Sequence, residues 1–344
     1  MEKQNIKATY YAILAAVFYA LNMPFSKVLL GNVPPTMMAA LLYIGAGIGI
    51  GAIYMVDQKD NANNKLEKSD LPYTLGMIVL DILAPVFLMF GLLHTTSANA
   101  SLLNNFEIVA TSLIALVVFK EMVSKRLWIA IALITLSSGI LSFEDMSSMR
   151  FSWGSLLVLA AALCWGLENN CTRKISSKNT FEIVMLKGIF SGTGSLTIGF
   201  AIGERLPELK YCLIALIVGF VAYGLSILFY VKAQYILGAA KTSAYYAIAP
   251  FVGAFLSFIC LREPLTKKYM LALVIMLIGT AVVIADTMIL HHIHLHTHTI
   301  VHTHDGITHS HTITHSHLHT HFGHQEQHCH THGKDYLAVH KLLK

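Results

Sequence analysis

Charged residues are scarce in this chain of 344 residues, because only 12% are Asp, Glu, Lys or Arg whereas 55% are hydrophobic. Together with a mean hydropathy of +0.60, this composition excludes an ordinary soluble domain. The five cysteines lack the CxxC spacing of redox and zinc motifs and favour packing roles. The N-terminus lacks the short apolar region and small-residue cleavage site of a secretory signal peptide, so we expect its first apolar segment to be a retained helix.

Ten apolar segments are each long enough to cross about 30 Å of hydrocarbon. The predicted fold class is therefore all-α, a polytopic membrane protein with ten transmembrane helices. Thirteen basic residues fall on one side of these segments and seven on the other, which favours cytoplasmic N- and C-termini and a place in the plasma or inner membrane. The segments are 9–30, 35–56, 72–93, 98–119, 125–143, 152–172, 181–203, 211–231, 240–261 and 266–287.

The two halves of the chain are related by a duplication. Each half holds five segments, and an odd number inverts the second half in the bilayer. Inverted repeats are how many secondary transporters build two related gates around a site near the midplane. We predict repeats at 8–145 and 150–287, followed by a tail at 291–344. An offset of 142 residues places Ser101, Glu121, Lys125 and Arg126 on Ser243, Glu263, Lys267 and Lys268, and an offset of 146 places Tyr19 and Lys27 on Trp165 and Arg173.

The recurring residues also carry a likeness to a known family. They are the run from Ala15 to Lys27, its counterpart from Ala161 to Arg173, and the helix ends Phe119-Lys120-Glu121 and Leu261-Arg262-Glu263-Pro264. In these the chain resembles the EamA-like members of the drug/metabolite transporter superfamily. The resemblance implies a proton-coupled or facilitated carrier of amino acids, metabolites or drugs, often an exporter, and no covalent catalysis. Two positions depart from the family: Ile108 replaces a usual proline, although Pro250 is kept, and Tyr43 replaces an arginine found in many members.

Two acidic residues, Asp81 and Glu107, lie near the middle of the third and fourth predicted spans, and Glu107 follows Asn104 and Asn105. An ionised carboxylate in hydrocarbon costs about 2.5–3.5 kcal/mol, so such groups normally face the bundle interior or a wet cavity. The tight turn at 94–97 should place the two carboxyls at similar depth. They form either a proton relay or cation site, or hydrogen-bonded carboxyls that hold helices together.

Other polar residues fall at repeat-related places. Asn22 aligns with Glu168, so both could line a shared cavity, or Glu168 could simply mark the cytoplasmic end of its helix. Tyr245 and Tyr246 precede Pro250 and could contact an organic substrate or pack against neighbouring helices. Glycines are concentrated in the second and seventh spans, where they predict close helix packing.

The tail holds eighteen of the nineteen histidines. Within each of two stretches, 294–304 and 309–319, the histidines keep one parity and would therefore share a face of an extended strand. A turn at Asp305-Gly306-Ile307-Thr308 would pair His304 with His309 and His302 with His311, with cross-strand imidazoles about 5 Å apart. That spacing suits Zn²⁺, Ni²⁺, Co²⁺ or Cu²⁺, and the alternative is a flexible polar tract. A looser cluster follows at 328–332. The predicted metal ligands are His294, His296, His298, His302, His304, His309, His311, His315, His317 and His319.

These features predict a secondary transporter that moves a small organic metabolite or amino acid by alternating access. We expect export, no required cofactor, a metal-binding regulatory tail, contact with the lipid bilayer and no nucleic-acid partner, with a homodimer possible. The alternatives are a divalent-metal transporter, in which the tail collects ions, and a membrane-bound metal sensor. The predicted substrate or coupling residues are Glu107, Asp81, Asn104, Asn105, Asn22, Glu168, Tyr245 and Tyr246.

Overall fold

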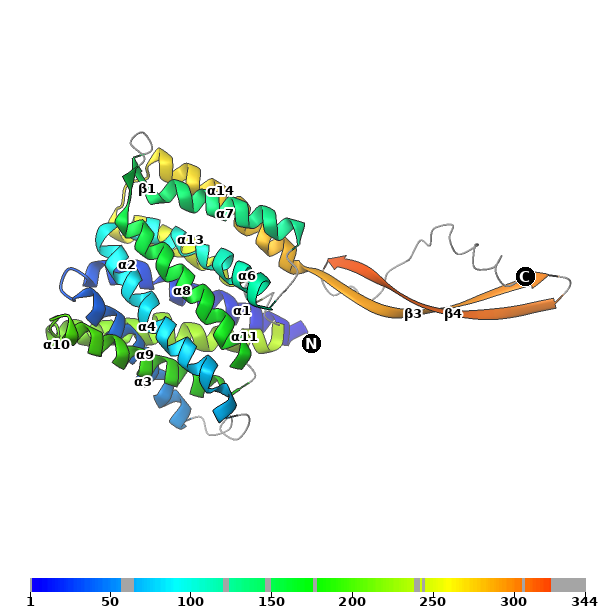
Figure 1. The fold of residues 1–344 in the computed structure, drawn as a ribbon, viewed down its shortest axis with the longest axis horizontal. Coiled ribbons are helices and arrows are strands. Elements are labelled where there is room, and N and C mark those ends of the chain that lie inside the picture. Colours follow the sequence, from blue (N-terminus) through cyan, green and yellow to red (C-terminus); the bar gives the residue numbers. More distant parts are fainter. Residues whose placement is uncertain are drawn as a thin grey trace. The chain divides into compact units, whose positions relative to one another are not determined.

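The computed structural model describes residues 2–56, 65–119, 124–145, 150–175, 178–237, 242, 245–304 and 307–322. It divides into two compact units, residues 1–286 and 287–344. The first unit is a helical bundle, shown in Figure 1. Glu121 and Ser243, which belong to the predicted repeat, and the histidines beyond 322 lie outside the described residues.

The described residues of the N-terminal half form seven α-helices, and a 3₁₀ turn at Lys68–Asp70 precedes the fourth. A short antiparallel pair, β1 (Phe143–Asp145) and β2 (Arg150–Phe151), separates it from the second half. The helices are α1 (Glu2–Ala20), α2 (Asn22–Leu29), α3 (Pro35–Val56), α4 (Leu71–His94), α5 (Ser97–Leu103), α6 (Phe106–Phe119) and α7 (Lys125–Ser142).

The C-terminal half continues with further α-helices and one π-helical turn. The π-helix, η3, joins two α-helices into one rod. These elements are α8 (Trp153–Ile175), α9 (Thr180–Ala201), α10 (Leu209–Gly219), η3 (Phe220–Leu225), α11 (Ser226–Leu237), α13 (Ala249–Leu261) and α14 (Lys267–Met288).

Among the described residues, seven helical segments are long and apolar enough to cross a membrane. They cover 6–29, 35–55, 68–94, 125–142, 180–201, 209–233 and 267–285. The three other predicted spans differ for identifiable reasons. The fourth is divided into α5 and α6, the sixth (α8) is polar in its C-terminal third, and the ninth (α13) has only 13 residues.

Several predicted continuous spans are interrupted. The chain breaks at Leu21 between α1 and α2 and at Asn104 and Asn105 between α5 and α6, and a turn at 247–248 precedes α13. At the α5–α6 break the Glu107 amide donates to the Asn104 carbonyl oxygen at 3.0 Å, an i to i+3 bond of the 3₁₀ type. The offset of 142 places Asn104 and Asn105 on residues 246 and 247, so the α5–α6 break and the break at 247–248 lie within one residue of equivalent positions.

Glycines allow α3 and α9, the second and seventh predicted spans, to cross in backbone contact. A Cβ atom built on Gly188 would lie 2.4 Å from both Gly47 Cα and Gly47 N, and one on Gly192 would lie 2.7 Å from Ile44 N. The predicted close packing of these helices is therefore confirmed. Gly219 plays the same role against α3, since its Cβ would lie 2.1 Å from the carbonyl oxygen of Leu42.

Ionic side chains bind helix termini at one end of the bundle, which we call the clamped end. Both carboxylate oxygens of Glu263 accept from α5 amides, Ser97 N at 2.7 Å and Ala98 N at 2.8 Å. Glu204 accepts in the same way from the first turn of α3. Lys27 donates to the carbonyl oxygens of Leu92, in the last turn of α4, and of Thr95, which follows the helix. Carboxylates at helix N-termini and ammonium groups at C-termini are both favoured by the helix dipole.

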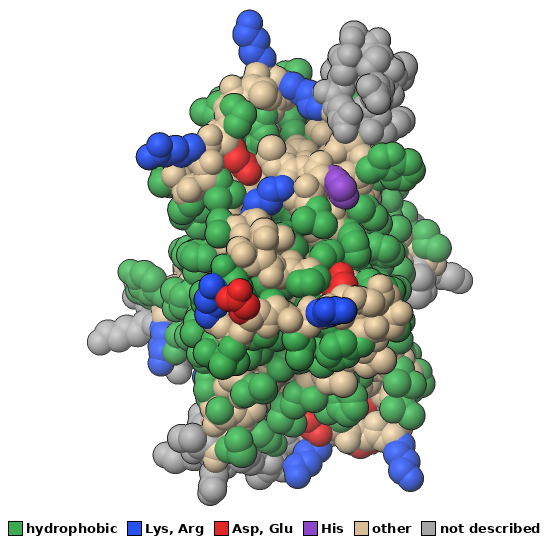
Figure 2. Space-filling view, turned by 90° about the vertical axis from the view of Figure 1, so that its left-hand side faces the viewer, with side chains coloured by type: hydrophobic (Ala, Val, Ile, Leu, Met, Phe, Trp, Pro, Cys, Tyr) green, Lys and Arg blue, Asp and Glu red, His purple; other side chains and the backbone are tan. Residues whose placement is uncertain are grey.

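Large apolar side chains cover much of the surface of the bundle. Ile48, Val117 and Phe255 are 59%, 76% and 62% exposed. On the face shown in Figure 2, hydrophobic side chains predominate and charged groups are isolated or in small pairs. The exposure of Ile48, Val117 and Phe255 suits contact with hydrocarbon better than contact with water.

The second unit contains two long antiparallel strands, β3 (Ile289–His304) and β4 (Ile307–Phe322). Its register differs by two residues from the predicted one, because the strands pair up to His304 opposite Ile307 and leave two residues between them instead of four. His302 therefore lies opposite His309 rather than His311, and His298 lies opposite Ile313. Histidine still faces histidine at positions 292 and 319, 294 and 317, 296 and 315, and 302 and 309. The connecting residues 305–306 lie outside the described residues.

Candidate functional site

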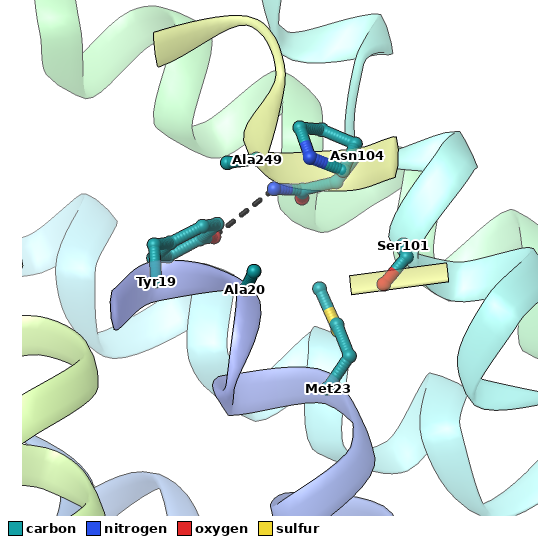
Figure 3. Close-up of a pocket in the computed structure, with 7 residues that line it drawn as sticks. Tyr19, Ala20, Met23, Ser101, Asn104 and Ala249 are labelled. Carbon is teal, nitrogen blue, oxygen red and sulfur yellow. Dashed lines mark hydrogen bonds between the residues drawn. The ribbon is translucent and has the colours of Figure 1, made fainter. Parts of the chain in front are cut away.

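A small pocket forms where three of the helix breaks converge (Figure 3). Its volume of about 10 Å³ is that needed for one water molecule. Asn104 Nδ2 donates to Tyr19 Oη at 3.0 Å across the pocket. Two further lining atoms, Ser101 Oγ and Asn104 Oδ1, are buried without a hydrogen-bond partner, which is the pattern of groups that bind water or a polar solute. The lining residues are Tyr19, Ala20, Met23, Ser101, Asn104, Ala249 and Pro250.

A cluster of five tyrosines adjoins the pocket. We call Tyr19, Tyr43, Tyr223, Tyr230 and Tyr246 the tyrosine cluster, because each ring centroid lies 5.0–5.9 Å from that of another member. The rings come from α1, α3, η3, α11 and the segment before α13, so both halves of the chain contribute. Aromatic groups with polar tips in contact are able to stack on an organic solute and hydrogen-bond to it.

An ion cluster lies at the junction of α4, α8 and α9. Lys187 Nζ lies 3.2 Å from Asp81 Oδ2 and 2.9 Å from Glu168 Oε1. The three residues are buried, with exposed fractions of 8%, 0% and 2%. Tyr43 Oη donates to Asp81 Oδ1 at 2.9 Å, and the Thr172 hydroxyl donates to Glu168. Asp81 Oδ2 has no hydrogen bond, so its contact with Lys187 is an ion pair without hydrogen-bond geometry.

Glu107 is connected to the ion cluster through Asn169, which follows Glu168 in α8. Asn169 Nδ2 donates to Glu107 Oε1 at 2.6 Å, while its neighbour Glu168 pairs with Lys187. Glu107 also interacts electrostatically with both Glu168 and Lys187. Unlike Asp81, Glu107 is only half-buried. The two carboxyls predicted to share a depth are therefore linked through α8 rather than in direct contact.

The structure brings most of the predicted site residues into this region. Asn22 Nδ2 donates to Tyr223 Oη at 3.1 Å, which joins the α1–α2 break to η3. Asn105 Nδ2 is buried without a hydrogen-bond partner. Tyr246 belongs to the tyrosine cluster, and Tyr245 is half-buried beside it in the chain. Burial and the ion pair place Glu168 in the interior, not at a wet helix end.

The predicted histidine ligands belong to the second unit, and their side chains lie outside the described part of the structure. Among the side chains that are described, no group of three His, Cys, Asp or Glu residues is placed to hold a metal ion.

Sequence reasoning did not single out Lys187, Tyr43 or Tyr223 as parts of the site. Lys187 carried a usable signal, because a lysine inside the apolar segment 181–203 is as costly in hydrocarbon as Asp81. Tyr43 was noted only as a departure from the arginine of the related family. Tyr223 lies in an apolar run and has no distinguishing neighbour in the sequence.

The chain is similar to transporter proteins over most of its length. A protein of Methanothermobacter thermautotrophicus described as an uncharacterized transporter is 27% identical over 288 residues, covering 78% of this chain and 83% of that protein. The uncharacterized transporter YyaM of Bacillus subtilis is 21% identical over 276 residues, covering 77% and 89%. One solved crystal structure shares the fold, with a TM-score of 0.61 at 16% identity over 80% of this chain and 95% of its own.

The family comparison covers both halves of the bundle. The model of the EamA-like transporter family matches twice, at residues 6–143 and at residues 152–285. The two matches together take in every residue of the pocket, the tyrosine cluster and the ion cluster. The chain therefore belongs to the EamA-like transporter family, within the drug/metabolite transporter superfamily, and is a multi-pass membrane transporter.

Proposed function

We propose that this protein moves a small organic metabolite or amino acid across the cell membrane by alternating access, in the direction of export. The observation that carries the proposal is the convergence of the repeat-related breaks on one pocket. Asn104 from the α5–α6 break and Pro250 from the start of α13 line it together. Discontinuous helices around a central site are the usual architecture of secondary transporters, because they expose backbone and polar groups to a solute.

The proposed arrangement has ten membrane segments in two inverted sets of five, with both termini in the cytoplasm. The seven long apolar helices support it directly, and the other three segments complete it as the paired half-helices α5 and α6, the polar helix α8 and the short helix α13. In this orientation the clamped end faces outward. Glu204 and Glu263, both from the second half, bind α3 and α5 of the first half there. The outer side of the transporter would then close when these contacts form and open when they break.

Flux measurements in liposomes test the proposal. Purified full-length protein would be reconstituted and assayed for uptake and efflux of an amino-acid panel and of Zn²⁺, Ni²⁺ and Co²⁺. We expect flux of an organic solute that Glu107→Gln reduces at least tenfold, about 1.4 kcal/mol or more of lost stabilisation. The matched control is Glu208→Gln, which removes an acid whose side chain is 71% exposed and lies away from the pocket. Metal flux without organic flux would refute the proposal.

A second proposal concerns the tail. Four cross-strand histidine pairs in the hairpin register support a site for Zn²⁺, Ni²⁺, Co²⁺ or Cu²⁺ with a regulatory role. Deleting residues 291–344 separates the alternatives, since the tail forms a compact unit of its own. A metabolite carrier retains organic flux after the deletion and loses only its response to metal. A metal carrier loses metal flux, and a sensor loses its signal entirely.

A further inference from the structure

The ion cluster contains more acidic than basic side chains. One ammonium group, that of Lys187, faces two carboxylates, those of Asp81 and Glu168. Glu107, held by Asn169, adds a third carboxyl that interacts with the same lysine. An ionised carboxylate without a partner is expensive in a low-dielectric interior, so these acids favour either a bound proton or a further positive charge close by.

The same region is lined with aromatic rings that suit a positively charged organic group. Tyr43 bonds to Asp81 and its ring lies 5.1 Å from that of Tyr223. Tyr223 lies 5.9 Å from Tyr19 in turn. Glu107 lies one turn beyond Asn104, because its amide donates to the Asn104 carbonyl oxygen at 3.0 Å, and the Asn104 side chain in turn donates to Tyr19 Oη of the tyrosine cluster at 3.0 Å. Ring faces beside carboxylates are the usual recognition elements for an ammonium ion.

We propose that the transported solute is an organic cation, a protonated amine, and that Lys187 is a tethered ammonium that competes with it for the carboxylates. This inference rests on the proposed transport function and names the substrate class. The incoming amine binds Glu107 and the tyrosine cluster from the pocket side. Lys187 holds Asp81 and Glu168 when no solute is bound, which prevents two buried carboxylates from standing unpaired.

Binding to the full-length protein in lipid nanodiscs tests the proposal. The probe is 2-phenylethylammonium, compared with neutral 2-phenylethanol and anionic phenylacetate. The readout is the fluorescence of Trp165, whose Nε1 donates to Tyr43 Oη at 3.5 Å. The other two tryptophans, Trp128 and Trp153, are 47% and 76% exposed and are replaced by Phe to remove their signal. We expect saturable quenching or enhancement by the amine, and none by the alcohol or the acid.

Substitutions at the cluster should change amine affinity in opposite directions. Lys187→Met removes the competing ammonium and should raise amine affinity about tenfold, which is about 1.4 kcal/mol. Glu107→Gln should lower amine affinity by a similar factor. The matched control is Glu208→Gln, which removes an acid whose side chain is 71% exposed and lies outside the ion cluster, and it should leave amine affinity within about twofold of wild type.

Three outcomes would overturn the proposal. Tighter binding of phenylacetate, abolished by Lys187→Met, would make the lysine an anion receptor. Unchanged amine affinity in every variant, with only a lower melting temperature, would reduce the cluster to a structural role. Flux of neutral or acidic solutes in liposomes without amine binding would refute the proposed cationic substrate but not the proposed transport function. Absence of any organic flux would instead refute the transport function itself.

Discussion

Replacing Gly188 by alanine should destabilise the bundle because of the way α3 and α9 cross. The added Cβ would lie 2.4 Å from Gly47 Cα and 2.7 Å from the carbonyl oxygen of Tyr43, and backbone atoms cannot move aside as a side chain does. Overpacking of this kind costs about 1–3 kcal/mol. The higher helix propensity of alanine relative to glycine offsets about 1 kcal/mol of this cost.

A matched control isolates the packing cost. Gly139 lies inside α7 and a Cβ atom there meets nothing within 4 Å, so Gly139→Ala gains helix propensity without a clash. The two variants should therefore differ by the full overpacking cost of about 1–3 kcal/mol, or several degrees in apparent melting temperature at about 2–4 °C per kcal/mol. The assay is thermal melting of purified protein in one detergent. Equal melting temperatures for the two variants would refute the backbone contact between α3 and α9.

Three further predictions concern other contacts. Glu263→Gln removes the charge of the carboxylate that binds the N-terminus of α5 and should lower the free energy of unfolding in detergent by about 1 kcal/mol. An unchanged melting temperature would show that this carboxylate does not bind the α5 amides. The hydrogen bond that Lys178 donates to Glu67 raises the pKa of the lysine above its ordinary value of 10.5, so this pair should stabilise the protein below pH 10.5 and stop doing so only as the pH rises past the raised value. Lys178→Met should thus have the same effect on the melting temperature at pH 6 and pH 9, and a large difference between the two would contradict the assignment. Gly253→Ala brings a Cβ within 2.6 Å of Ser101 Oγ and should destabilise by about 1–2 kcal/mol, whereas adding Ser101→Ala should restore most of the loss, and additive losses would argue against the contact.

The sequence predicted the helical membrane class and the duplication, because composition and repeats are one-dimensional properties. It could not show the break at Asn104, since an average over some twenty residues hides two asparagines among apolar neighbours. Pro250 was visible as a helix breaker, but its convergence with Asn104 on one pocket depends on tertiary packing. The glycines of α3 and α9 predicted close helix packing correctly, because two helices can approach closely only where their residues are small, whichever helix is the partner.

The sequence identified Asp81 and Glu168 individually as candidate site residues, but it did not show that both pair with Lys187. Asp81 and Glu168 are 87 positions apart in the chain, and both reach Lys187 only because α4, α8 and α9 pack together. The hairpin register was wrong for a different reason. A shift of two residues keeps every side chain on the same face, so alternation alone cannot distinguish one register from the next, and the length of the turn decides.

The brevity of α13 has a consequence for the biogenesis of the protein. Thirteen residues of α-helix extend about 20 Å, well short of the roughly 30 Å hydrocarbon layer. A segment this short partitions poorly into lipid on its own, so we expect it to be held in the membrane by packing against other transmembrane helices. Its contacts include the N-terminal half: Ser257 Oγ donates to Ser97 Oγ of α5 at 2.8 Å, and Gly253 abuts Ser101. Ribosomal synthesis delivers α5 long before α13, so we expect the first half of the chain to be in place when α13 packs against it.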